Sequence, residues 1–242
     1  MAAEARRRAM TAAMTTAMSA APSPRAFRGA AAAAAFVALV AMGAVGPAAP
    51  ARAESWNFEV RLDGKPIGTH RFTVDGPAEA REVTSNAAFD VRLLGINVFR
   101  YRHEARERWR GDCLQEIRSR TDDDGKPVEV DRRLASAMPG EPACLMSYAY
   151  WNPALIRQQR LLNPQTGEVD EVHIERLPDA AIPAGGRDVD ASRWRITSTA
   201  PSSGKSAPAR QVLTLWRDRT DGRWLGLDAQ VKGDRVLTYR LP

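Results

Sequence analysis

The chain has 242 residues, 35 of them basic and 29 acidic, and its formal net charge is +6 at pH 7. Most of this excess lies in the first 53 residues, which hold six arginines and one acid; without them 29 basic and 28 acidic residues remain. A nearly neutral remainder lacks the basic surface that nucleic-acid binding needs, so we exclude nucleic acid as a partner despite the isoelectric point of 9.8.

The first 53 residues have the pattern of an export signal. Five arginines precede an apolar stretch from Ala30 to Val45, and Ala51-Arg52-Ala53 matches the small-x-small pattern that signal peptidase cleaves. The alternative is a transmembrane anchor, but the stretch is short and alanine-rich for about 30 Å of hydrocarbon. We therefore predict a cleaved signal peptide over residues 1–53, a periplasmic or secreted location, and no stable membrane anchor after cleavage. Residues 54–242 are expected to form a single β domain.

Strand-like alternation of apolar and polar residues begins directly after this leader. Residues 55–74 predict a hairpin around the turn Asp63-Gly64, and Val83–Leu93 predicts a third strand. The next strand, from Val98 to about Trp109, has the clearest two-sidedness in the chain. One face carries Phe99, Tyr101, His103, Ala105, Glu107 and Trp109, and the other carries five arginines with Glu104.

His103 and Glu107 are polar groups on an otherwise apolar strand face, so each needs hydrogen-bond partners or a wet cavity. Two interpretations stay open. In the plain one they bond to neighbouring side chains or lie at the sheet edge. In the sharper one this face lines a ligand pocket inside a curved sheet, and its ligand-binding residues are Phe99, Tyr101, His103, Glu107 and Trp109. The arginine face predicts a solvated surface with cross-strand ion pairs, rather than a patch that binds anionic headgroups or polysaccharide.

Two cysteines, Cys113 and Cys144, lie outside the leader. Two lone cysteines in an oxidising compartment most simply pair, so we predict a structural disulfide between them. Two separate thiols or a redox pair are the alternatives, and the Cys-x-x-Cys spacing typical of redox pairs is absent. The nearby residues Tyr148, Tyr150 and Trp151 are interpreted as core packing around the disulfide rather than as a ligand site.

The second half of the chain is predicted to contain one short helix and further strands. Asn152-Pro153 predicts a helix N-cap followed by proline, so one short helix is expected over Ala154–Leu162. Strand patterns resume near Val169 and end in a three-stranded meander over residues 211–241. With about ten strands, we predict a mainly β fold: a single antiparallel, strongly curved sheet or partly open barrel with one short helix.

Motifs of high chemical specificity are missing from the sequence. The three histidines, His70, His103 and His173, have no partner at metal-ligand spacing, and no nucleophile elbow or phosphate-binding loop occurs. The acidic run Asp122–Gly125 is interpreted as a hairpin turn rather than a calcium loop. We therefore predict no metal, no cofactor and no catalytic residue.

Several segments together resemble a known family. They are Ser55–Phe58 (SWNF), Asp63–Gly68 (DGKPIG), Tyr101–Trp109, Cys144–Pro153 (CLMSYAYWNP) and Leu161–Glu168 (LLNPQTGE). The family is an exported bacterial one, domain of unknown function 6134, and the resemblance spans nearly all of residues 55–242. It implies export and a β fold, and it supplies no reaction, substrate or catalytic residue.

The leading functional hypothesis is an exported protein that binds a lipid or another apolar or amphipathic small molecule within its curved sheet. An envelope protein–protein interaction or assembly factor is the alternative. A third hypothesis is an enzyme that uses His103 and Glu107, which the lack of a catalytic signature disfavours.

Overall fold

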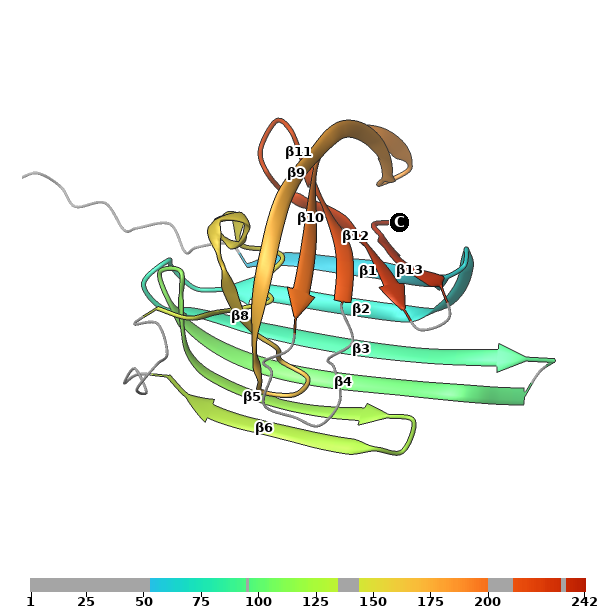
Figure 1. Cartoon of the computed structure of the whole chain (residues 1–242), viewed down its shortest axis with the longest axis horizontal. Coiled ribbons are helices and arrows are strands. Elements are labelled where there is room, and N and C mark those ends of the chain that lie inside the picture. Colours follow the sequence, from blue (N-terminus) through green and yellow to red (C-terminus); the bar gives the residue numbers. More distant parts are fainter. Residues whose placement is uncertain (1–52, 95, 135–143, 200–210, 232–233) are drawn as a thin grey trace, which may run out of the picture. The chain divides into compact units, whose positions relative to one another are not determined.

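The computed structural model describes residues 53–94, 96–134, 144–199, 211–231 and 234–242. The predicted signal peptide lies outside these residues except for Ala53, so its cleavage stays a prediction. Within the described ranges, no helix is long and apolar enough to cross a membrane. The described strands all belong to one thirteen-stranded sheet (Figure 1).

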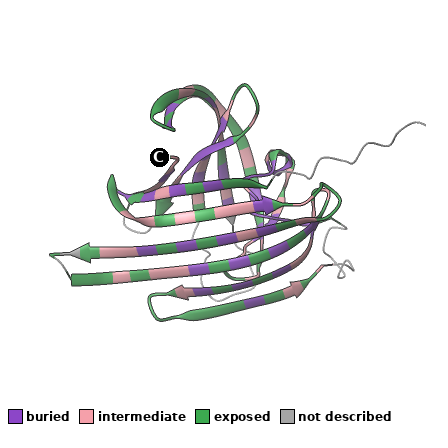
Figure 2. Ribbon diagram, turned by 180° about the vertical axis from the view of Figure 1, so that it is seen from behind, coloured by how far each residue is buried: buried purple, intermediate pink, exposed green. Residues whose placement is uncertain are grey.

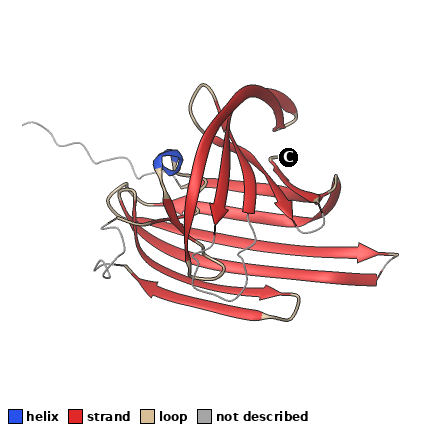
Figure 3. Cartoon of the chain, viewed as in Figure 1, coloured by secondary structure: helices blue, strands red, loops and turns tan. Residues whose placement is uncertain are grey.

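Strands make up nearly all of the described regular structure, and one short helical turn interrupts them (Figure 3). The first six strands are β1 (Glu54–Leu62), β2 (Lys65–Asp75), β3 (Arg81–Leu93), β4 (Ile96–Arg110), β5 (Cys113–Asp123) and β6 (Pro127–Arg133). Next come β7 (Met146–Ser147), the 3-10 helix η1 (Pro153–Arg157), β8 (Arg160–Leu162), β9 (Val169–Ala184) and β10 (Arg187–Thr199). The last three strands are β11 (Gln211–Asp218), β12 (Trp224–Val231) and β13 (Arg235–Arg240).

The strand order is β6-β5-β4-β3-β2-β1-β13-β12-β11-β10-β9-β8-β7. The first strand therefore pairs with the last one, and most neighbours are joined by hairpins. All pairs are antiparallel except β7 with β8, which run parallel. The sheet is not closed, because β6 and β7 are its two end strands. The prediction of a single curved sheet or partly open barrel is confirmed. The prediction that it is entirely antiparallel is corrected by the parallel pair β7–β8.

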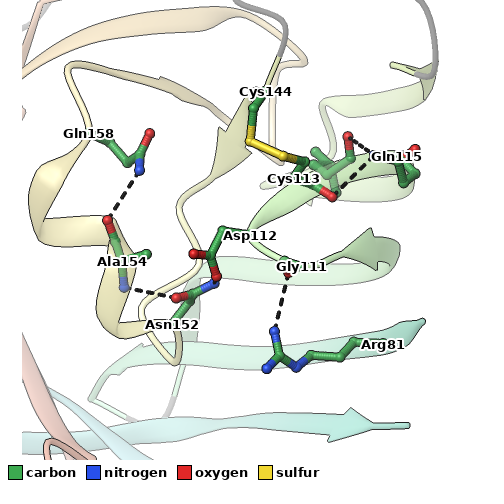
Figure 4. The surroundings of a disulfide bond; sticks show 10 residues. Arg81, Gly111, Asp112, Cys113, Gln115, Cys144, Asn152, Ala154 and Gln158 are labelled. Atoms are coloured by element: carbon green, nitrogen blue, oxygen red, sulfur yellow. Dashed lines mark hydrogen bonds between the residues drawn. A yellow bond between two sulfur atoms is a disulfide. The ribbon is translucent and has the colours of Figure 1, made fainter. Parts of the chain in front are cut away.

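The two end regions of the sheet contact each other. The Leu114 amide donates to the Leu145 carbonyl at 2.9 Å, so β5 touches the segment leading into β7. The predicted disulfide joins Cys113 to Cys144 at the same place (Figure 4). The β8–β9 turn also reaches β6: a Cβ at Gly167 would lie 3.1 Å from Cγ1 of Val130, so glycine permits this approach.

Alternation of buried and exposed residues explains why these segments form strands (Figure 2). In β4 the alternation predicted from the sequence is present: His103, Ala105 and Glu107 are buried, whereas Glu104 and Arg106 are exposed. Apolar side chains on the buried face are removed from water, and this burial stabilises the packing of each strand.

The predicted hairpin at Asp63-Gly64 is confirmed. Both residues have positive φ, 50° and 79°, as a tight two-residue β-turn requires.

The predicted helix is the main local error. The expected start is correct, since the Asn152 side chain accepts a hydrogen bond from the Ala154 amide at 2.8 Å. However, the helix is a 3-10 turn over Pro153–Arg157, and the residues Arg160–Leu162 form strand β8. Leu161 and Leu162 are fully buried in the main core, so pairing with β7 and β9 overrides a weak helical pattern.

Candidate functional site

A cavity of about 590 Å³ lies inside the curved sheet. Its walls come from β1 to β4 on one side, from β11 to β13 on the other, and from residues 148–150 and 163–165. Strands from opposite ends of the sequence thus enclose the space, because β1 pairs with β13. Its size falls in the range of sites that hold small organic ligands.

Aromatic and aliphatic side chains make up most of the cavity wall. All four tyrosines of the chain line it: Tyr101, Tyr148, Tyr150 and Tyr239. The Phe89 and Tyr101 rings stack with centroids 5.2 Å apart, and the same wall continues to Tyr239, 6.3 Å from Phe89. Rings that pack against one another restrict each other's rotation, so the wall is largely preformed.

Two histidines lie in this wall on either side of Ala87. His70 on β2 and His103 on β4 both pair with Ala87 on β3, and their ring centroids are 6.5 Å apart. Nε2 of His70 bonds Ser85 at 2.7 Å, and Nδ1 of His103 bonds Thr121 at 2.9 Å. Each ring therefore bonds a neutral hydroxyl group, and within the described ranges no carboxylate bonds to either ring.

Burial keeps both imidazoles uncharged at neutral pH. It lowers the pKa of His103 from 6.5 to about 4. The pKa of His70 lies well below its usual value, mainly through burial and secondly through the charge that His103 would carry. Burial likewise raises the pKa of Tyr101, Tyr148 and Tyr239, so their phenols stay protonated.

Formal charge is nearly absent from the described cavity wall. Arg235 is the charged lining residue, and its Nε contacts Oδ2 of Asp63 at 2.7 Å in a partly exposed ion pair. The other polar groups are hydroxyls, imidazoles and the amides of Asn163, Gln165 and Gln211. Such a surface suits an apolar body with a few neutral polar atoms, and it would penalise a buried ion.

The structure brings three of the five predicted ligand-binding residues to this cavity. Phe99, Tyr101 and His103 line it, whereas Glu107 and Trp109 do not. Glu107 instead borders an adjoining space of about 30 Å³, which shares the His103 wall. Trp109 is only 2 % exposed and packs edge-on against Trp151 at 5.4 Å. A role of any of these residues in ligand binding stays a prediction.

Glu107 has its own buried partners. Its Oε2 accepts a hydrogen bond from Nε1 of Trp109 at 2.9 Å, and the Ser147 hydroxyl also bonds to the carboxyl group. Burial raises its pKa from 4.5 to about 7, against the lowering effect of these two bonds. These bonds agree with the first interpretation of Glu107, in which its carboxyl group bonds to neighbouring side chains.

Other cavity residues escaped the sequence prediction. His70 and Tyr239 come from strands far from β4 in the chain, and alternation alone does not indicate which strands will face each other. Tyr148 and Tyr150 pack in or against the main core, as predicted, but both also line the cavity, which the prediction did not include. Trp151 does pack in the core, with the Arg81 guanidinium 5.5 Å from its ring centroid.

The remaining polar features are structural. The arginine face of β4 is largely exposed, and three of its five arginines form ion pairs with residues that the structure describes: Arg100 and Arg102 contact Asp90 at 3.6 and 2.8 Å, and Arg108 contacts Glu82 at 3.6 Å. At the acidic turn, the Gly125 amide donates to Oδ1 of Asp122 at 2.6 Å. Among the described residues, His, Cys, Asp and Glu form no group of three or more that could hold a metal ion.

Comparisons with known proteins agree on the fold and leave the function unassigned. No curated protein matches the chain. A solved structure, the crystal structure of a beta-barrel-like protein of domain of unknown function DUF1849 from Brucella abortus, superposes with a TM-score of 0.52. The alignment has 11 % sequence identity and covers 81 % of this chain and 98 % of that one, so it supports the fold alone. A family model matches residues 58–241. The chain therefore belongs to the family described as domain of unknown function (DUF6134).

Proposed function

We propose that this protein is an exported binding protein that holds an apolar or amphipathic small molecule in the cavity inside its curved sheet. The observation that carries the proposal is the composition of the wall: four tyrosines, two neutral histidines and aliphatic side chains around about 590 Å³. The export pattern of residues 1–53 and the Cys113–Cys144 disulfide support an oxidising compartment.

An enzyme that uses His103 and Glu107 receives less support from the same geometry. His103, bonded to Thr121, and Glu107, bonded to Trp109, both border the small space of about 30 Å³. This space has room for a water molecule but not for an organic substrate, and of the two residues His103 alone also lines the large cavity. General acid–base catalysis needs both groups within reach of one substrate. Binding therefore accounts for the site better than turnover does.

The proposal is tested with protein expressed with its own leader and purified in processed form. Titration with the uncharged fluorescent probe N-phenylnaphthylamine should give saturable binding with one site per chain. Native mass spectrometry before and after organic extraction should report any molecule that copurifies. If the wild-type protein neither binds the probe nor carries an extractable molecule, the proposal is wrong.

A cavity-filling variant locates the bound probe. Ala229 is 6 % exposed and lines the cavity, so Ala229→Trp should weaken probe binding about tenfold by occupying the space. Ala88→Trp is the matched control, because Ala88 is exposed on the outer face of β3. Equal binding by both variants would place the probe elsewhere on the protein.

A further inference from the structure

The hairpin of β3 and β4 projects beyond the rest of the sheet. Strand β2 accompanies β3 only to the pair Gly68–Phe89, and β5 accompanies β4 only to the pair Tyr101–Asp123. Residues 90–94 and 96–100 thus form a two-stranded ribbon that pairs with no further strand in the described part of the chain (Figure 1). At its base, the Arg100 backbone still bonds to Asp124 of the β5–β6 turn. Two-stranded ribbons are marginally stable by themselves, so an apolar tip on one needs an explanation other than folding.

The tip of this ribbon is strongly apolar and exposed. Leu94, Ile96 and Val98 are 95 %, 70 % and 51 % exposed. The other large apolar side chains that are exposed in the described part of the chain are Val128, Val231 and Val236. Each of these valines lies within two residues of the β5–β6 or β12–β13 turn, at the same end of the sheet as the ribbon tip. Exposed apolar surface is therefore concentrated at one end of the strands, as at an interaction site.

This same end borders the cavity. Val98 of the ribbon and Val231 of β12 are both exposed and both line the cavity, and Val91 and Phe99 continue the lining inward. We define the apolar rim as Leu94, Ile96, Val98, Val231 and Val236. A partner that covers this rim would lie directly beside the cavity entrance.

Charges on the ribbon indicate which partner fits. Asp90 is shared by Arg100, at 3.6 Å, and Arg102, at 2.8 Å, and Arg92 has no ion pair among the described residues. The ribbon itself thus carries an excess of guanidinium groups next to its apolar tip, while the acidic β5–β6 turn lies at its base. Aliphatic side chains flanked by arginines match the interface of a bilayer that contains anionic lipid.

We infer that the apolar rim docks on the surface of a phospholipid bilayer, from which the cavity takes its ligand or to which it delivers it. This inference rests on the proposed function. A bilayer is favoured over a second protein copy because its own amphipathic molecules have the chemistry that the neighbouring cavity accepts. Docking would bring the cavity entrance to the source of ligand and would shield the rim from water.

The test is cosedimentation of the processed protein with vesicles of phosphatidylethanolamine containing one quarter phosphatidylglycerol. The double variant L94E/I96E should lower the vesicle-bound fraction at least tenfold, because its acidic side chains resist insertion and repel anionic lipid. The matched control A78E/A80E adds the same two charges at exposed positions within the β2–β3 connection, at the opposite end of these strands, and should bind like the wild type.

Probe titration without vesicles separates this inference from the proposed function. L94E/I96E should still bind N-phenylnaphthylamine, which shows that the variant is folded and its cavity intact. As a second readout, Leu94→Trp should shift its emission to the blue with vesicles and be quenched by brominated lipid. Wild-type protein that binds the probe but stays in the supernatant with all vesicles overturns docking alone. A dimer that L94E/I96E converts to a monomer, without vesicle binding, assigns the rim to self-association and also overturns it.

Discussion

At the scale of single residues, the cavity wall depends on polar groups that burial holds in their uncharged forms. His70 and His103 stay neutral because desolvation disfavours the imidazolium ion and the partners of the two rings, Ser85 and Thr121, are neutral hydroxyl groups. Burial also favours the uncharged form of Glu107. For a carboxyl group this is the protonated form, so its pKa is raised instead of lowered. Neutral hydrogen-bonding groups can thus line an apolar cavity without a buried ion.

Glu107 makes protein stability depend on pH in a defined direction. Its pKa is 4.5 when unfolded and about 7 when folded, so the folded state binds the proton more tightly. The stability that this proton provides is complete below pH 4.5 and is lost as the pH rises to about 7. Glu107→Gln keeps the neutral form, and its free energy of unfolding should exceed that of the wild type by up to about 3 kcal/mol at pH 8, with little difference at pH 4.

Urea denaturation at several pH values measures this difference. The histidines contribute equally to both proteins, so their titration cancels. Glu104→Gln is the control, because Glu104 is exposed on the opposite face of the same strand. A stability difference for Glu107→Gln that does not change with pH would contradict the buried-proton explanation.

At the scale of elements, a disulfide and hydrogen bonds join the two end regions of the sheet, β5–β6 and β7–β8. We call this contact the seam. Strand β7 has two residues and would be a weak edge by itself. Its approach is secured by the Cys113–Cys144 disulfide, the bond from the Leu114 amide to the Leu145 carbonyl, and the bond from Arg132 Nη1 to the Gly167 carbonyl at 2.8 Å. These contacts also hold residues 148–150 and 163–165 against the cavity.

Loss of the disulfide should therefore lower stability markedly. The bond links positions 31 residues apart, and closing a loop of that length removes about 4 kcal/mol of chain entropy from the unfolded state. The variant C113S/C144S should show a free energy of unfolding lower by about this amount in urea denaturation. Dithiothreitol should destabilise the wild type and leave the variant unchanged; equal stability of oxidised and reduced wild type would show that the seam does not need the bond.

Sequence patterns could predict individual strands but not how they meet. Alternation identified the buried face of β4, with His103 and Glu107 on it, because period-two burial is a local property. It could not show that Tyr239 of β13 would line the same cavity as Tyr101 of β4, since that depends on the curvature of the whole sheet. Strand β8 was mistaken for helix because its three residues are set by pairing with β7 and β9.

At the scale of the whole molecule, the cavity gives the protein a space that remains unfilled by its own side chains. Strands at both ends of the sequence close around it through the β1–β13 pairing, so a bound molecule would contact both halves of the sheet at once. Occupancy should therefore stabilise the folded state as one unit. This coupling follows from linkage, because the unfolded chain has no cavity to bind the ligand.

Thermal unfolding with the uncharged probe tests that coupling directly. At ten times its Kd, N-phenylnaphthylamine should raise the free energy of unfolding by about 1.4 kcal/mol, which corresponds to a rise in Tm of about 3 to 6 °C for a chain of this size. Circular dichroism measures the transition without interference from probe fluorescence. Ala88→Trp should show the same rise as the wild type, whereas Ala229→Trp at the same probe concentration should show a much smaller one. An equal rise in Ala229→Trp would mean that stabilisation comes from a surface site, and the cavity would lose its assigned role.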